Sequence, residues 1–524
     1  MSDDNDSNDS NDDDDDDDDE SGNLISLFKS RNKEKDIFYF KRIEIRRVST
    51  KGVEGLGLEI HFMYNFANNV DIISRLVLEP KIFNVLVQQY YSNDDDNDDD
   101  NVYINRVFDD LEQSPRFFRM ILSIGLCILP WYWMGFACKS IVLEEDATRG
   151  LMNDDMLQFW DTLYNNVLLE FMYMHKLSWK ISIRVIGLNE KDIKTNEDNW
   201  IISNDDDNRT LIALGGGKDS LVALHLAEND GREPVLMYSA DGLLEFEASW
   251  RLQKIVEVSE KDHHVMRHEI QSAIFEKNAR SFCYPCGHPW AALVIFDSLL
   301  LCSLQKINHV SLGFERSADE GNGVYVNEVE VNHQYDKSSI FLELAREYIN
   351  RHINPKLSVY SLLSNMWELE ISRIFCESPS LQKYHNLFIS CNEPVDEAEW
   401  CLKCEKCCFI FLLISAWLTP PQVVSIFGTN LFENEKLLNV FLSLVGVNTA
   451  QYAHKPFDCV GTANEAKNSV YLCSMRYREY INDTSTDDRR TLPVVIIELC
   501  KQLYSTLDEH GLPPPISVEE ILHF

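Results

Sequence analysis

One short segment combines a backbone that can approach an anion with side chains that can bind one. It consists of Gly215, Gly216, Gly217, Lys218, Asp219 and Ser220. An apolar run at 210–214 precedes it and a helical pattern at 221–229 follows, so the glycines lead into a helix N-terminus, whose N–H groups and partial positive charge attract phosphate. Lys218 can neutralise phosphate charge, Ser220 can donate its hydroxyl, and Asp219 can hold Mg²⁺. The segment predicts a site for a nucleotide's phosphates with Mg²⁺.

This glycine loop differs from the two commonest phosphate-binding motifs. In G-x-x-x-x-G-K-[ST] a Ser or Thr follows the lysine, whereas here Asp219 follows it and Ile212 occupies the first glycine position. The pattern G-x-G-x-x-G does not fit either. A glycine-rich turn that serves tight packing alone is the alternative interpretation.

A second chemical pattern is a cysteine cluster with the spacing C-x₉-C-x₂-C-x₂-C. Its members are Cys391, Cys401, Cys404 and Cys407. Four thiolates can converge on one tetrahedral ion and leave no position for water, which predicts a structural Zn²⁺ site. Two alternatives stay open, a ligand set that uses Cys408 and a cluster without metal. The pair Cys283 and Cys286 has no visible partners and is interpreted as free thiols.

The segments around the glycine loop alternate between short apolar runs and helical patterns. We expect strands at 210–214, 234–240, 264–269 and 309–315, and helices at 221–229, 243–258 and 288–305. This alternation predicts an α/β fold with a doubly wound parallel sheet. Ligands of such sheets bind at the carboxyl ends of the strands, where the glycine loop lies.

The rest of the chain predicts three further parts. Residues 1–22 form a low-complexity acidic tail that we expect to be disordered. Residues 23–205 form an amino-terminal α+β domain with a hairpin of 38–48 and 58–66, an Asp/Asn loop insertion at 93–101 and helices over 106–180. The nucleotide-binding domain then spans 206–390, and 391–524 forms a zinc-bearing helical region. The uncharged stretch 120–138 is long enough for a membrane span, but its central Pro130 and aromatic residues favour a buried helix–turn–helix.

Composition limits the kinds of molecule that the protein is expected to bind. The chain has 524 residues and a net charge of −37, with 48 Lys and Arg against 85 Asp and Glu. Because three acidic runs at 1–20, 94–100 and 205–207 supply much of this charge, the remainder is moderately acidic, which argues against a nucleic-acid partner. No secretory signal is visible, and fourteen cysteines without one indicate reduced thiols in the cytoplasm.

The glycine loop resembles the S-G-G-x-D-S loop of the N-type ATP pyrophosphatases, with Gly215 in place of the first Ser. This group includes GMP synthetase and 7-cyano-7-deazaguanine synthase, and the latter has similar cysteine spacing after its nucleotide domain. The resemblance implies an ATP pyrophosphatase-like fold that splits ATP between its α- and β-phosphates and adenylylates a substrate oxygen. ATP, Mg²⁺ and Zn²⁺ are the implied cofactors.

Further segments resemble one particular family within this group. The sequence is similar to the ATP-dependent UDP-N-acetylmuramoyl-L-alanyl-L-glutamate epimerases over roughly 38–480, and most specifically between 211 and 465. The segments that carry it are 287–289 (GHP), 313–318 (GFERSA), 320–322 (EGN), 331–335 (VNHQY), 337–338 (KS), 390–392 (SCN) and 455–462 (KPFDCVGT). Weaker matches are 129–131 (LPW) and 169–171 (LEF).

The resemblance implies inversion of a peptide-bound L-glutamate in peptidoglycan biosynthesis. Adenylylation releases pyrophosphate and removes the charge of the α-carboxylate, which makes the α-proton accessible, and hydrolysis then releases AMP. The candidate proton carriers are His288, His333 and Cys459, and we favour Cys459 because Lys455 is a nearby cation that can lower its pKa. The candidate substrate-binding residues are Arg316, Ser317, Asn332 and Lys337.

Three alternatives remain at this point. The substrate can be another L-glutamyl compound, or the chain can be an enzyme similar to 7-cyano-7-deazaguanine synthase or a tRNA-modifying pyrophosphatase. From another class, it can be a zinc-stabilised nucleotide-binding module without turnover. The preferred hypothesis is an epimerase whose partners are ATP and a nucleotide-linked peptide, without a nucleic acid or a membrane.

Overall fold

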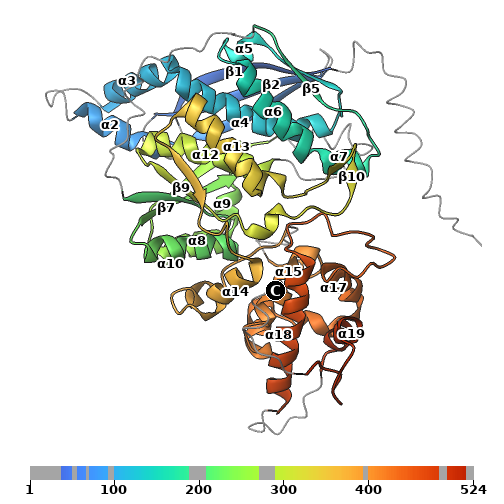
Figure 1. Cartoon of the computed structure of the whole chain (residues 1–524). Coiled ribbons are helices and arrows are strands. Elements are labelled where there is room, and N and C mark those ends of the chain that lie inside the picture. The colour runs from blue at the N-terminus through green and yellow to red at the C-terminus, as the bar shows by residue number, and fades with distance from the viewer. Residues whose placement is uncertain are drawn as a thin grey trace, which may run out of the picture.

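The computed structural model describes residues 37–49, 56–66, 70–91, 100–187, 208–270, 289–392, 399–482 and 492–514. The acidic tail, His288, Cys283 and Cys286 lie outside these ranges, as does most of the Asp/Asn insertion. The sheet is built from β1 (Ile37–Ser49), β2 (Leu56–Phe66), β3 (Val70–Leu78), β4 (Ser140–Leu143), β5 (Ser182–Val185), β6 (Arg209–Ala213), β7 (Glu233–Ala240), β8 (His263–Glu269), β9 (His309–Leu312) and β12 (Ser358–Ser361). These ten strands form one continuous sheet in the order β12-β9-β6-β7-β8-β3-β2-β1-β4-β5 (Figure 1).

The second half of the sheet is parallel throughout, which agrees with the predicted strand and helix alternation. β6 pairs in parallel with both β7 and β9. Because β7 and β8 extend the sheet on one side of β6 while β9 and β12 extend it on the other, the strand order reverses between β6 and β9. That gap is where ligands bind in doubly wound sheets. The helices of this half are α8 (Lys218–Asn229), α9 (Glu245–Ala248), α10 (Trp250–Ser259), α12 (Trp290–Gln305) and α13 (Ser339–Tyr348). The sequence missed β12, which pairs with β9.

The amino-terminal half confirms the expected hairpin and extends it. β1 and β2 pair antiparallel with Phe38 opposite Phe66 and Ser49 opposite Leu56, and β3 adds a third strand. β3 also pairs antiparallel with β8, so the two halves share one sheet. The helices here are α2 (Asn84–Tyr91), α3 (Asp100–Gln113), α4 (Pro115–Met134), α5 (Glu145–Thr148), α6 (Asp154–Val167) and α7 (Leu169–Met174).

The apolar stretch 120–138 forms most of one helix, α4, so the predicted helix–turn–helix is wrong. Pro130 lacks the N–H that would bond to the Leu126 carbonyl, and the Tyr164 hydroxyl donates to that carbonyl at 2.6 Å instead. This replacement lets the helix continue past the proline. Among the described residues α4 alone is long and apolar enough to cross a membrane, and 94% of its apolar stretch is buried inside the protein.

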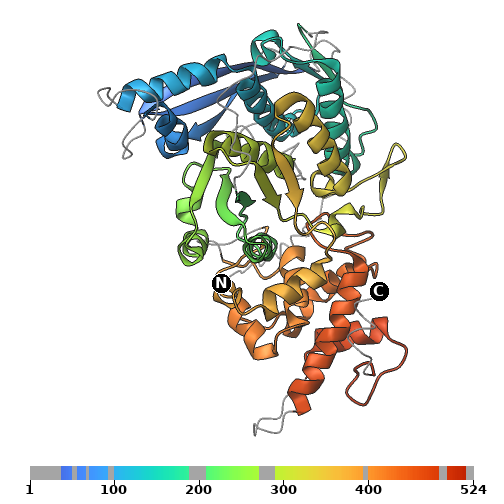
Figure 2. The same cartoon turned by 60° about the vertical axis from the view of Figure 1, so that its left-hand side comes forward.

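The remaining helices form a layer below the carboxyl edge of the parallel strands (Figures 1 and 2). They are α14 (Glu368–Glu377), α15 (Glu405–Ser415), α16 (Pro420–Phe427), α17 (Leu438–Leu444), α18 (Ala463–Asn482) and α19 (Val494–Leu503). Alternate residues of β6 face different cores, with Leu211 packed in the core that contains α4 and α12 and Ile212 in the core that contains α8 and the carboxy-terminal helices. The junction between the parallel strands and this helical layer holds the site described next.

Candidate active site

The glycine loop connects β6 to α8 as predicted, and its shape depends on the missing side chains. Gly216 has φ +76°, and a Cβ there would lie 2.8 Å from Leu252 Cδ2. A Cβ on Gly217 would lie 2.6 Å from Ser390 Oγ. Gly217 caps α8 without a side-chain hydrogen bond, and Ser220 Oγ donates to the Gly217 carbonyl at 3.0 Å. Gly216 and Gly217 therefore allow Leu252 and Ser390 to pack against the start of α8, whose first N–H groups can bind phosphate.

Ser390 is a feature of this site that sequence reasoning did not assign. Its hydroxyl is buried beside Gly217 and has no hydrogen-bond partner among the described residues. A buried hydroxyl without a partner is costly, so it favours a ligand that accepts its proton. Ser390 thus offers a phosphate hydroxyl donor near the place where Gly215 replaces the first Ser of the resembled motif.

Lys218 points away from solvent into a group of carboxylates. Its side chain is fully buried and pairs with Asp219 and with Glu368 of α14. Although burial opposes it, these two carboxylates raise the pKa of Lys218. Burial, together with the charge of Asp219, raises the pKa of Glu368 to about 7. Lys406 of α15 lies on the other side, with Nζ 3.7 Å from Glu368 Oε1.

Cys459 occupies the next position in this polar network. Lys337 Nζ lies 3.2 Å from Cys459 Sγ. The His333 side chain lies beside the same thiol, where each of the two groups shifts the pKa of the other. Lys406 donates to the Cys459 carbonyl. Burial alone would raise the pKa of Cys459, but Lys337 and His333 hold it well below its usual value. The geometry therefore describes a thiolate held by cations.

His333 is the partner of this thiolate. Its Nδ1 lies 2.5 Å from Glu170 Oε2 of α7, so the ring is held between a carboxylate and a thiol. Burial would lower the pKa of His333, but the hydrogen bonds to Cys459 and Glu170 raise it to about 10. Cys459 and His333 thus form one thiolate–imidazolium pair, rather than the two separate candidates that the sequence suggested.

The cation beside Cys459 is a correction to the sequence hypothesis. Lys337, assigned to substrate oxygens, contacts the sulfur, whereas Lys455 donates to the Glu320 carbonyl at 3.4 Å. The reason is the fold of the 331–338 segment, which brings His333 and Lys337 to the same sulfur. Sequence spacing favoured Lys455 because it lies in the same short segment as Cys459.

The other predicted substrate-binding residues lie around the carboxyl end of β9. Arg316 is exposed and stacks over Trp367 at 4.6 Å, and Ser317 is buried with a hydroxyl that has no partner among the described residues. Asn332 uses its side chain within the protein, donating to the Ala318 carbonyl at 2.9 Å and accepting from Gln334 N at 2.8 Å. Arg316 and Ser317 therefore have the free groups that a ligand needs, and Asn332 supports the loop.

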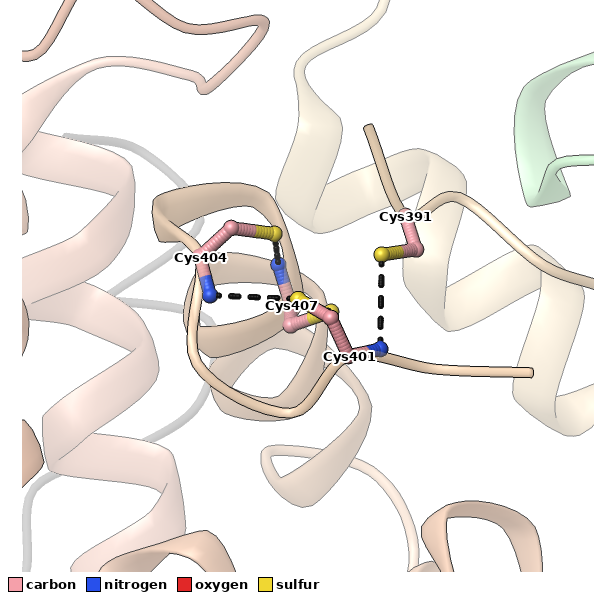
Figure 3. Close-up of side chains that lie close together, drawn as sticks. All are labelled: Cys391, Cys401, Cys404 and Cys407. Atoms are coloured by element: carbon pink, nitrogen blue, oxygen red, sulfur yellow. Dashed lines mark hydrogen bonds between the residues drawn. The ribbon is translucent and has the colours of Figure 1, made fainter. Parts of the chain in front are cut away.

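The four predicted cysteines converge (Figure 3). Cys391, Cys401, Cys404 and Cys407 have sulfurs that all lie within 4.8 Å of one another, and the Cys401 and Cys407 sulfurs are 3.7 Å apart. Tetrahedral Zn²⁺ with Zn–S bonds of about 2.3 Å needs sulfurs about 3.8 Å apart, so the donor set fits this ion. Backbone N–H groups also point at the sulfurs, as from Cys404 to Cys401 at 3.4 Å. Cys408 is buried and is not part of the cluster.

Asp458 ties the cysteine cluster to the thiolate. Its Oδ1 accepts from Cys459 N at 2.6 Å and from the Asn392 side chain, and its Oδ2 accepts from Lys406 N at 3.0 Å. Asn392 follows the first cysteine of the cluster and Lys406 precedes the last. The cluster and the Cys459 loop therefore hold each other in place through one carboxylate.

Several residues of the site were missed from the sequence, chiefly Glu170, Glu368, Lys406 and Asp458. Glu170 and Asp458 lie inside the segments that carry the family resemblance, and Lys406 lies inside the cysteine pattern. Their places in these segments could therefore have indicated that they belong to the site. Glu368 had no such signal, because a single acidic residue in a helical pattern resembles any solvated helix face.

Comparison with known proteins agrees with these features. Residues 89–362 match the MurL N-terminal domain and residues 387–486 match the MurL C-terminal domain. A protein from Micromonospora sp. named UDP-N-acetyl-alpha-D-muramoyl-L-alanyl-L-glutamate epimerase is 30% identical over 326 residues, which cover 59% of this chain and 67% of the relative. Proteins of the same name from Xanthomonas oryzae pv. oryzae (27% over 327 residues; 58% and 66%) and Salinispora tropica (28% over 310; 58% and 63%) are also similar.

The alignments with these relatives span about two thirds of their length. The two matched domains contain the glycine loop, the cysteine cluster and Cys459. By this match over more than half of its length, the chain belongs to the MurL family.

Proposed function

We propose that this protein is an ATP-dependent epimerase that inverts the terminal L-glutamate of UDP-N-acetylmuramoyl-L-alanyl-L-glutamate, or of a related L-glutamyl compound. The reaction proceeds through an acyl adenylate and releases AMP and pyrophosphate. The relatives named as this epimerase support the substrate class. The site supports the chemistry.

The single observation that carries the proposal is the place of the Cys459–His333 pair. The pair lies in the same connected polar network as Lys218 of the glycine loop, through Lys406 and Glu368. A nucleotide-activating loop and a proton-transfer pair therefore belong to one site. A nucleotide-binding module without turnover does not require the Cys459–His333 pair.

Activation belongs to the loop. The N–H groups of α8, Ser220 and Ser390 bind phosphate oxygens, and the substrate α-carboxylate attacks the α-phosphate of ATP, which expels pyrophosphate. Mg²⁺ held at Asp219 would neutralise charge on the phosphates during this step. The product is an acyl adenylate, in which the former carboxylate no longer carries a negative charge next to the α-carbon.

Inversion belongs to the thiolate. Cys459 Sγ takes the α-proton, because its neighbours Lys337 and His333 keep it ionised and the acyl adenylate delocalises the resulting charge as an enolate. Cys459 and His333 lie together and serve one face of the enolate, so the proton for the other face comes from a different group or from water. Hydrolysis of the acyl adenylate then gives AMP and the D-glutamyl product.

The experiment is incubation with ATP, Mg²⁺ and the UDP-muramoyl dipeptide. We expect AMP release together with D-glutamate after acid hydrolysis of the product. AMP release on a carboxy-deazaguanine instead would favour the alternative pyrophosphatase. ADP as the main nucleotide product would exclude the proposed chemistry.

The cysteine cluster completes the proposal as a structural Zn²⁺ site. A bound zinc ion would cross-link the segments that contain Cys391 and Cys407, and its four thiolate ligands would leave no coordination position for water. The thiol-rich chain and its nucleotide-linked substrate fit the cytoplasm, where ATP is present and thiols stay reduced.

A further inference from the structure

A small pocket opens beside the loop that carries Cys459. Its walls come from the 320 region, from the segment after α17, and from both sides of Cys459. The residues that matter here are Glu320, Asn448, His454, Lys455, Val460 and Gly461. On its other side Gly461 packs against the interior, where a Cβ would lie 2.7 Å from Phe409 Cζ and 2.8 Å from Glu465 Oε2. Val460 and Gly461 follow Cys459 directly in the chain, and the charge of Cys459 acts on Lys455, although Cys459 itself does not line the pocket.

Lys455 is a half-buried cation in this pocket without an acidic partner. Its one described hydrogen bond goes to the backbone carbonyl of Glu320 at 3.4 Å, and it forms no ion pair with a carboxylate of the described residues. Burial lowers the pKa of Lys455, although the nearby charges of Glu320, Glu465, Glu315 and Cys459 oppose this. A partly buried ammonium without an ion-pair partner favours an anionic ligand.

Asn322 fixes this pocket relative to the proton-transfer pair. Its Nδ2 donates to the carbonyls of Lys455 and Pro456 at 3.3 and 2.9 Å, while its Oδ1 accepts from His333 N at 2.9 Å. Gln334 Nε2 also donates to the Val460 carbonyl at 3.2 Å. The segments that carry Lys455, His333 and Cys459 are therefore held as one unit.

We infer that Lys455 binds the free γ-carboxylate of the glutamyl substrate. This inference rests on the proposed function, in which the α-carboxylate is converted to the acyl adenylate and the γ-carboxylate remains the free carboxylate of the glutamyl residue. Only two methylene groups separate that carboxylate from the α-carbon at Cys459. Lys455 is thus a specificity residue that selects glutamate over glutamine.

The test compares two ligands that differ only in this group. UDP-N-acetylmuramoyl-L-alanyl-L-glutamate and its γ-carboxamide analogue are titrated calorimetrically into the full-length protein without ATP. We expect the wild-type protein to prefer the carboxylate by about 10- to 100-fold, as one hydrogen-bonded charge provides. Lys455→Met should reduce the preference to about threefold or less, and Lys455→Arg should retain most of it.

Glu320→Gln is the matched control. If Lys455 served only to neutralise Glu320, adding this change to Lys455→Met would restore the wild-type preference, and the inference would be wrong. An unchanged preference in a Lys455→Met protein with wild-type melting temperature would also overturn it, as would equal wild-type binding of both ligands. Because binding is measured without turnover, a protein that shows the preference but releases no AMP contradicts the proposed function and not the subsite.

Discussion

At the scale of single residues, the ionisation of Cys459 is the property that the neighbouring charges control. Lys337 and His333 lower the pKa of Cys459 against the effect of burial. Because thiolate is the species that reacts with iodoacetamide, Cys459 should be alkylated already at neutral pH. Lys337→Met should move the midpoint of the alkylation–pH curve to higher pH. Mass spectrometry of the modified peptide measures this, and an unmoved midpoint would contradict the role of Lys337.

The same pair allows activation and inversion to be separated. Cys459→Ala and His333→Gln should keep AMP release but lose solvent deuterium incorporation at the glutamate α-carbon by about 10²–10⁴-fold. The reason is that neither side chain contacts the glycine loop directly. Exchange in D₂O and AMP release are measured side by side. Equal loss of both would assign these residues to substrate binding or to structure.

Substitutions in the glycine loop should instead lower AMP formation itself. Asp219→Asn removes one carboxylate that pairs with Lys218, and Ser220→Ala removes a hydroxyl at the helix start. Each change should lower AMP formation by about 10²–10³-fold, a typical effect of removing one positioned group. A Mg²⁺ titration distinguishes the two variants. If Asp219→Asn keeps the wild-type rate at low Mg²⁺, Asp219 has no metal role.

At the scale of elements, the cysteine cluster determines how α15 meets the loop before α18. Cys401→Ser or a strong chelator under reducing conditions should release about one Zn²⁺ per chain and lower the melting temperature. Because Asp458 joins the cluster to Cys459, alkylation of Cys459 should change as well. Cys408→Ala, next to the cluster but not in it, is the matched control. A chelated protein with unchanged metal content and melting would contradict the zinc assignment.

The elements also show what the sequence could and could not predict. The strands β6 to β9 and the cysteine spacing followed from local patterns, since apolar runs and ligand spacing are visible in short windows. The sequence predicted a turn within α4 because a proline usually interrupts a helix. The prediction was wrong because the Tyr164 hydroxyl, which comes from another helix, donates to the Leu126 carbonyl that Pro130 leaves without its partner. Glu170 reaches His333 across 163 positions, and no local pattern predicts such a contact. The fold and the convergence of the four cysteines were therefore more predictable than the charges around Cys459.

At the scale of the whole molecule, the shared sheet makes two sequence domains into one structural unit. Arg75 to Val77 of β3 pair with Arg267 to Glu269 of β8, and Arg75 Nε lies 2.5 Å from Glu269 Oε2. We expect calorimetry to show one unfolding transition for residues 23–390, without an earlier step for the amino-terminal half. Two well-separated transitions, one sensitive to ATP and one not, would contradict this.

The antiparallel pair between β3 and β8 also limits how the chain can be shortened. A truncated protein that begins at residue 206 would leave β8 with a row of unpaired N–H and C=O groups, and it would uncover the face of α12 that packs against α4. Open strand edges of this kind recruit strands from other copies, which leads to aggregation. The amino-terminal strands therefore cover this edge of the parallel half and should prevent such aggregation.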